Sequence, residues 1–171
     1  MGRRWDTYTG TQYPDRGVAP QPATHLRAAL LALNGTEVPF VVRAARPEEK
    51  ADLVAEWRIQ EPAWQSLFAR SRLNRQLRIR MRLIPEKCEV RTLDEQWEVT
   101  WVGTTPTFAT SRQYSRGPAT TVSQRWTYEQ GPDGRRRRVE TFSFDSRELK
   151  DPLRTTVLGA GWTWRGVVFK L

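Results

Sequence analysis

Hydrophobic and polar residues alternate along much of the chain, which is the pattern of strands with one buried face. The clearest case is the segment QLRIRMRL, residues 76–83, in which hydrophobic residues occupy one face and arginines the other. The segments that we predict as further strands are 38–45, 51–59, 88–93, 96–102, 106–114, 121–129, 137–144 and 162–171.

Three segments show helical spacing instead. Residues 24–35 place leucines on one face, and a second helix is predicted to begin at Pro62, because proline suits the first helical position. A third helix is predicted within 146–159, with Asp145 as its N-cap. Pro152 is expected to kink this helix or to mark its start.

These elements predict an α+β fold, a mainly antiparallel sheet or part-barrel with two or three packed helices. Residues 51–83 and 137–171 share the order strand, helix, strand, which suggests an internal pseudo-repeat of elements. Residues 1–23 are rich in glycine and proline and show no periodicity, so we predict an irregular N-terminal arm. Residues 24–171 then form a single α+β domain.

Four segments, DLVAEWRI, PAWQSLF, EVRTLDEQWEVTW and GAGWTWRGVVF, resemble a family of small actinobacterial proteins. The resemblance covers roughly residues 38–171 and leaves out the arm. It implies a bacterial cytoplasmic setting, but it brings no assigned activity, cofactor or catalytic residue.

The composition narrows the class of partner. The net charge is +9, and only four of the 28 basic residues are lysines. Two explanations fit this arginine excess: a GC-rich genome, or recognition of phosphate. The single cysteine, Cys88, excludes an internal disulfide and favours the cytoplasm, and no hydrophobic run approaches the length of a membrane span.

Residues for catalysis are scarce. His25 is the only histidine, and Cys88, predicted on an inward-facing strand position, is read as a small buried hydrophobe. We therefore expect no enzyme activity, no cofactor and no metal site. Asp145, Glu148 and Asp151 leave a metal-dependent nuclease as a minor alternative, although their spacing fits helix caps better.

The run of four arginines at 135–138 follows a turn, GPDG, in a predicted hairpin. A turn that pairs residue 130 with Arg135 also pairs Glu129 with Arg136, and a bulge would shift this register by one. Because strand side chains alternate, Arg135 and Arg137 lie on one face, and the run is not a four-arginine patch.

A single-faced basic surface is predicted instead on the strand at 76–83. Arg78, Arg80 and Arg82 repeat about every 6.6 Å along it, near the phosphate spacing of nucleic acid. Arg91, on the next strand, is expected to lie on the same face. Arg75 directly precedes the strand and is expected to add to the basic surface. The alternative is a face covered by acidic side chains such as Glu89 and Glu98.

The N-terminal arm adds Arg3 and Arg4 beside the aromatic residues Trp5, Tyr8 and Tyr13. Basic and aromatic residues together suit stacking on bases, although the arm can equally lie over its own domain.

The sequence therefore predicts a non-enzymatic module that contacts a polyanion, DNA or RNA, mainly through its phosphates. Two alternatives stay open. One is a subunit or scaffold role, in which the arginine face meets an acidic protein or a second copy of the chain. The other is a small-ligand carrier with a cavity lined by tryptophans, although core packing is the expected role of the five strand tryptophans, Trp97, Trp101, Trp126, Trp162 and Trp164.

Overall fold

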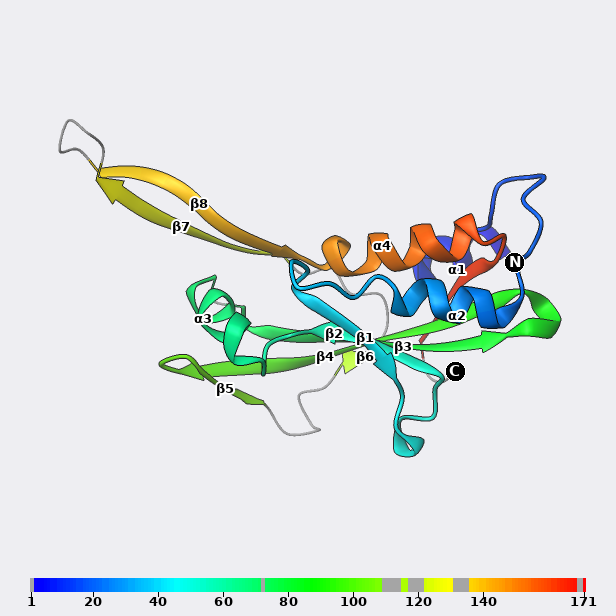
Figure 1. The fold of residues 1–171 in the computed structure, drawn as a ribbon, viewed down its shortest axis with the longest axis horizontal. Helices are drawn as coiled ribbons and strands as arrows, with labels where there is room; N and C mark the ends of the chain where they lie inside the picture. The colour runs from blue at the N-terminus through cyan, green and yellow to red at the C-terminus, as the bar shows by residue number, and fades with distance from the viewer. Residues whose placement is uncertain (1, 72, 109–114, 117–121, 131–135, 169–170) are drawn as a thin grey trace.

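The computed structural model describes residues 2–71, 73–108, 115–116, 122–130, 136–168 and 171. It confirms the predicted α+β class: helices pack on a mainly antiparallel, half-barrel sheet. In Figure 1, α2 and α4 lie along one side of this sheet, and the hairpin of β7 and β8 projects away from the body.

The main sheet has seven strands, of which five follow one another in antiparallel order. These five are β1 (Phe40–Ala44), β2 (Leu53–Trp57), β3 (Arg75–Ile84), β4 (Glu89–Val102) and β5 (Thr105–Phe108). The remaining two, β6 (Ser115–Arg116) and β9 (Thr163–Val167), both pair with β4, and β9 does so in parallel. β4 therefore lies at the centre of the pairing.

Four α-helices occur in the described residues, and two short 3-10 turns follow β1 and β3. The helices are α1 (Gly2–Thr9), α2 (Ala23–Leu31), α3 (Pro62–Arg70) and α4 (Ser146–Gly159). The 3-10 turns are η1 (Pro47–Glu49) and η2 (Pro85–Lys87). As predicted, α3 begins at Pro62 and α4 lies within 146–159, whereas α2 is shorter than predicted.

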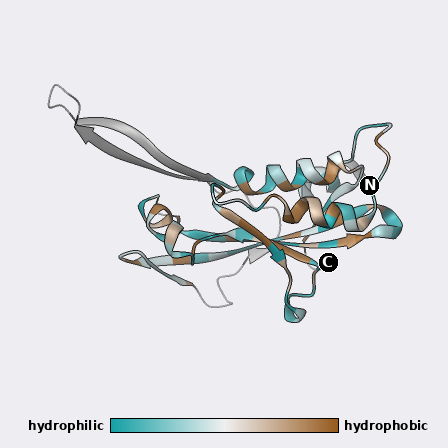
Figure 2. Ribbon diagram, in the orientation of Figure 1, coloured by the Kyte–Doolittle hydropathy of each residue, from teal (hydrophilic) through white to brown (hydrophobic). Residues whose placement is uncertain are grey.

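The hydrophobic core lies between the sheet and the helices α2 and α4. The inward face of β3 supplies Leu77, Ile79 and Met81, all fully buried or nearly so, as the alternation predicted. The helices contribute buried stripes at helical spacing, for example Leu26 and Leu30 from α2. Figure 2 shows strongly hydrophobic stretches on α2 and β1, and the buried residues of both elements belong to the same core cluster.

The helix α4 runs unbroken through Pro152, so the expectation of a start at this proline was wrong. Asp145 is the N-cap, as predicted, and its side chain accepts a hydrogen bond from the backbone N–H of Arg147 at 2.9 Å. Leu149 and Leu153, on either side of the proline, are both buried against the core. Packing on this shared face holds the helix together across the position that lacks a backbone donor.

The N-terminal segment is more regular than the sequence predicted, because residues 2–9 form the helix α1. After this helix the chain crosses the end of β9: Gln12 and Trp164 exchange two backbone hydrogen bonds of 2.8 and 2.9 Å. A β-carbon on Gly166 would lie 1.9 Å from the carbonyl oxygen of Thr9. Glycine at 166 is therefore what lets the arm lie against the sheet.

The hairpin register differs from the simple turn that the sequence predicted. In β7 (Val122–Gln130) and β8 (Arg136–Asp145), Gln130 pairs with Arg136 and Glu129 with Arg137. The connection at 131–135 is thus one residue longer than a four-residue turn. A further register shift of one residue lies between Arg125 and Trp126, deeper in the hairpin.

Two other local expectations were wrong. The segments 88–93 and 96–102 are not separate strands but one strand of 14 residues, β4. Cys88 is not a strand residue: it ends η2 with a left-handed backbone, φ 47°, and its side chain is partly buried against the core. Both strand–helix–strand stretches are present, but their strands pair differently. In the first stretch β2 pairs with β3, whereas in the second β8 pairs with β7 and β9 pairs with β4.

Candidate functional site

The predicted arginine face exists on the outer side of β3. The pairing of β3 with β4 is regular from Arg75 to Ile84, so side chains alternate without interruption and Arg78, Arg80 and Arg82 share one face. Arg91 joins this face from the next strand, β4, as predicted, and it lies directly opposite Arg82. Arg75 has the opposite parity, so it projects on the other face, where it donates to Gln96 Oε1 at 3.2 Å.

At the β1 side of this face the positive charges are tied to carboxylates. Arg43 donates from both terminal nitrogens to Glu49, each at 2.8 Å, and its Nε donates to Glu56 at 3.1 Å. Arg78 donates to the other oxygen of Glu56 at 2.8 Å and lies 3.7 Å from Glu49. The two arginines therefore share two glutamates.

Glu49 is the deepest of these acids, with only 6 % of its side chain exposed. Hydrogen bonds from Arg43 outweigh the effect of burial, with further help from the backbone N–H of Arg46, and lower the pKa of Glu49 to about 2. The same contact raises the pKa of Arg43 above its usual range. Both groups stay charged at neutral pH.

Arg80, next along the strand, is also engaged. Its Nε lies 2.8 Å from Glu95 Oε1, and its Nη1 donates to the backbone carbonyl of Glu49 at 2.6 Å. Only 14 % of the Arg80 side chain is exposed. The neutralised part of the face is thus Arg43, Arg78 and Arg80 against Glu49, Glu56 and Glu95, and its acids are not the Glu98 that the sequence suggested.

The other end of the face is less balanced. Arg82 of β3, Arg91 of β4 and Arg165 of β9 lie side by side in register on three neighbouring strands, and we call them the arginine row. Arg82 donates to the backbone carbonyl of Lys50 at 2.8 Å. Among the described residues, the carboxylates within ion-pair distance of the row are Glu89 and, at 3.9 Å, Asp6.

Glu89 is the acid beneath the row, one of the two covering acids that the sequence suggested. Its oxygens accept from Arg91 Nε at 2.9 Å and from Arg165 Nε at 2.7 Å. Burial opposes ionisation of Glu89, but the hydrogen bonds from Arg165 and Arg91 outweigh it and lower its pKa. One buried carboxylate therefore serves two arginines, and Arg82 has no acid of its own in the described part of the chain.

The N-terminal arm lies next to the row. Asp6 of α1 faces Arg165, and the ring of Tyr13 lies 5.9 Å from the Arg165 guanidinium. Trp5 and Tyr8, whose ring centroids are 5.5 Å apart, are 53 % and 60 % exposed. The exposed ring of Tyr13 therefore lies beside the row, and Trp5 and Tyr8 belong to the helix whose Asp6 faces it.

The other predicted arginines belong to the N-terminal arm and to the segment of the hairpin. Arg4 is exposed on α1, and Arg3 belongs to the same helix. Arg135 lies outside the described residues, and of Arg137 the structure describes only the backbone, in β8.

A pocket of about 530 Å³ opens at the opposite end of the face from the row. It lies between the ends of β1 to β5 and the segment 58–61 that leads into α3. Its hydrophobic lining comes from Val41, Trp57, Ile59, Trp97 and Phe108. Its polar lining comes from Arg43, Glu56, Arg58, Gln60, Glu61, Gln76 and Arg78.

Most of the predicted tryptophans serve the core instead. Trp162 and Trp164 are almost fully buried, and Trp162 Nε1 donates to the carbonyl of Gln21 at 2.8 Å. Trp101 is partly buried and donates to the carbonyl of Leu73. The side chain of Trp126 lies outside the described residues. Of the five, Trp97 lines the pocket, and so does Trp57, which is not one of the five.

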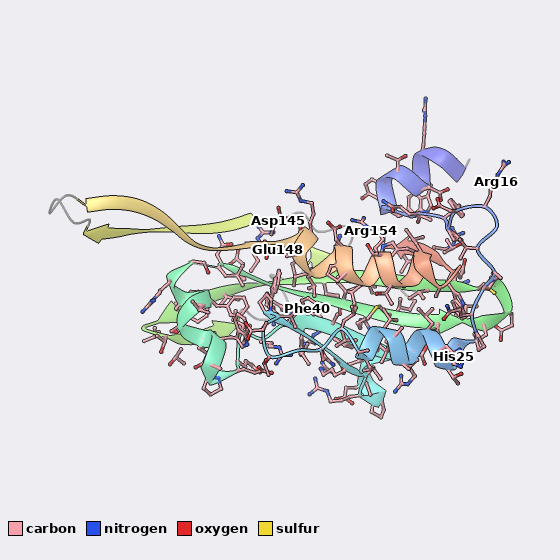
Figure 3. All side chains as sticks on the ribbon, turned by 45° about the horizontal axis from the view of Figure 1, so that its top comes forward. Arg16, His25, Phe40, Asp145, Glu148 and Arg154 are labelled. Carbon is pink, nitrogen blue, oxygen red and sulfur yellow. The ribbon has the colours of Figure 1, made fainter. Side chains whose placement is uncertain are left out.

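The carboxylates considered for a nuclease are involved in local contacts. Asp145 caps α4 and pairs with Arg147, whose hydrogen bond lowers the pKa of Asp145, and Asp151 pairs with Arg154. Figure 3 shows Asp145 and Glu148 at the start of α4 and Arg154 further along it, while His25 lies on α2. Within the described residues, no three acidic, histidine or cysteine side chains are grouped to hold a metal ion.

Comparisons of the chain with models of protein families, with curated proteins and with solved structures found no match. Across the described parts of the chain, every helix is too short or too polar to cross a bilayer.

Proposed function

We propose that this protein is a non-enzymatic binding module for a polyanion, DNA or RNA, and that the arginine row is its main contact. The observation that carries the proposal is the register that sets Arg82, Arg91 and Arg165 side by side over one buried glutamate. Like charges on directly opposite strand positions repel one another. A bound phosphate reduces that repulsion, because it adds negative charge next to three arginines that have one buried carboxylate among them.

The charge balance favours the row over the rest of the face. Arg78 and Arg80 already have carboxylate partners, and a phosphate must compete with these for each guanidinium. Arg82 donates to a neutral carbonyl, so a phosphate gains a charge-assisted hydrogen bond without displacing an acid. The proposed contact therefore lies at the Arg82 end of β3 and not along its whole length.

The arm supports the same proposal. Exposed aromatic rings stack on unpaired bases regardless of sequence, and arginine beside them holds the backbone. Trp5 and Tyr8 belong to the helix that packs against β9, which carries Arg165. A single strand of RNA or DNA that crosses the row is then within reach of both kinds of contact. The lone cysteine and the actinobacterial resemblance make the bacterial cytoplasm the proposed setting.

The direct test is a titration of a fluorescently labelled 20-nucleotide RNA, and of a DNA duplex, against salt. We expect binding at about 50 mM salt and a linear fall of log K with log salt concentration, with a slope of about −0.7 to −0.9 for each phosphate contacted. Absent binding at 50 mM salt, or a flat dependence, contradicts the proposal. A defined oligomer in light scattering that ignores nucleic acid favours the subunit role instead.

A further inference from the structure

The pocket is separate from the arginine row, and its charges are already paired. Arg43 and Arg78 bond Glu49 and Glu56, as described above. Arg58 donates to the carbonyls of Phe40 and Gly35, at 2.8 and 3.0 Å, and to Glu61 at 3.2 Å. Because every arginine in the lining is engaged, the pocket does not have the character of an anion site.

One polar atom of the lining lacks a partner. Gln76 is 5 % exposed, and among the described residues its Oε1 has no hydrogen bond. Its Nε2 donates to the backbone carbonyl of Trp57 at 3.1 Å, which fixes the orientation of the amide, since a flipped amide would set oxygen against oxygen. A buried acceptor without a donor is unfavourable. Gln76 lines the pocket, and its Oε1, which has almost no exposed surface, is an acceptor that a bound donor would satisfy after a small shift of the lining side chains.

The hydrophobic lining is suited to a flat ring. Trp97 faces Gln76 across the β3–β4 pairing, and the Arg78 guanidinium lies 4.7 Å from its ring centroid. Trp57, Ile59 and Phe108 complete the hydrophobic part of the lining. A volume of about 530 Å³ is within the range of sites for small organic ligands, which bind through aromatic walls and a few fixed polar groups.

We infer that the pocket binds a planar heteroaromatic ring that carries N–H donors, of the nucleobase type, with a donor directed at Gln76 Oε1. The carboxylates Glu56 and Glu61 in the lining keep further lone pairs for a donor, and the arginines that they hold are not free to bind a phosphate. Two sources share this chemistry: a free nucleoside and an unpaired base of a nucleic acid. The inference does not depend on the arginine row.

The experiment uses isothermal titration calorimetry with adenosine and with N6,N6-dimethyladenosine, which has the same ring system without the exocyclic N–H donors. We expect adenosine to bind the intact protein at least about tenfold more tightly, because the methylated ring leaves Oε1 unsatisfied. Binding of adenosine should depend little on salt, which separates this site from phosphate contacts. Equal affinity for the two nucleosides overturns the inference.

A second arm identifies the source. An adenine-bearing single strand is compared with an abasic strand of equal length, in the intact protein and in Gln76→Met. A preference for the adenine strand that Gln76→Met removes assigns the pocket to a base of the nucleic acid; a preference confined to free adenosine assigns it to a nucleoside. The inference fails if neither adenosine nor the adenine strand is distinguished from its control, whether or not the strands bind through the row.

Discussion

Arg82 lies directly opposite Arg91 in the antiparallel pairing of β3 and β4. Two like charges at such a position destabilise a sheet by a few tenths of a kcal/mol to about 1 kcal/mol. A carboxylate at either position would relieve the repulsion, as Glu56 does for Arg78 further along β3. The charges on this face of the sheet are therefore balanced at the β1 side and in positive excess at the arginine row, so the basic surface is at the row.

Replacing Glu89 with glutamine tests whether this acid restrains the row. The change removes the charge shared by Arg91 and Arg165, so nucleic-acid affinity should rise and the salt slope should steepen by up to about 1. The free energy of unfolding, measured in urea, should fall by about 1–3 kcal/mol, because a buried charge-assisted contact is lost. Both quantities come from the same purified variant.

The control for this prediction is Glu98→Gln, the same change at an exposed position on the other face of β4. An equal gain in affinity in both variants would show that net charge alone matters.

Glu49 should make the protein sensitive to acid. Its pKa is about 2 in the folded state against an ordinary value of 4.5, so the unfolded state binds more protons between these values. The stabilisation, about 3 kcal/mol from the shift, is fully present above pH 4.5 and is lost as the pH falls toward 2. In urea unfolding, Glu49→Gln should be less stable than the wild type at neutral pH. This difference should shrink steadily below pH 4.5, and a difference that is constant with pH would contradict the assignment.

Replacing Gly166 with alanine should displace the N-terminal arm. The new β-carbon would lie 1.9 Å from the Thr9 carbonyl oxygen, a backbone atom that must move away. We expect faster tryptic cleavage after the exposed Arg16, and a loss of about 1–3 kcal/mol of stability from overpacking. Gly35→Ala, at a position with open space around the added carbon, is the matched control. Equal cleavage in the two variants would mean that the arm does not depend on this contact.

The sequence predicts the elements well because their signals are local. Alternation over 76–83 identifies β3 and its two faces, and Pro62 marks the first residue of α3. The charge balance of the face depends instead on long-range neighbours. Glu49, which neutralises Arg43 and approaches Arg78, comes from a 3-10 turn whose position next to β3 has no local signal.

The arginine row shows the same limit. Arg165 alternates with the buried Trp164 in the last strand, so its outward direction was visible in the sequence. Its place beside Arg91 was not, because that place follows from the parallel pairing of β9 with β4, between segments far apart in the chain. The pocket likewise depends on Gln76 and Trp57 meeting across strands.

The most direct test of the arginine row compares Arg82→Gln with Arg75→Gln in salt titrations of nucleic-acid binding. Both residues belong to β3, both changes remove one positive charge, and each arginine donates to a neutral acceptor, so neither change leaves a carboxylate unpaired. They differ in the face that they occupy. We predict that Arg82→Gln weakens binding and lowers the salt slope by about 1, while Arg75→Gln leaves the slope unchanged. Equal losses in the two variants, or a larger loss in Arg75→Gln, would contradict the assignment of polyanion binding to the row.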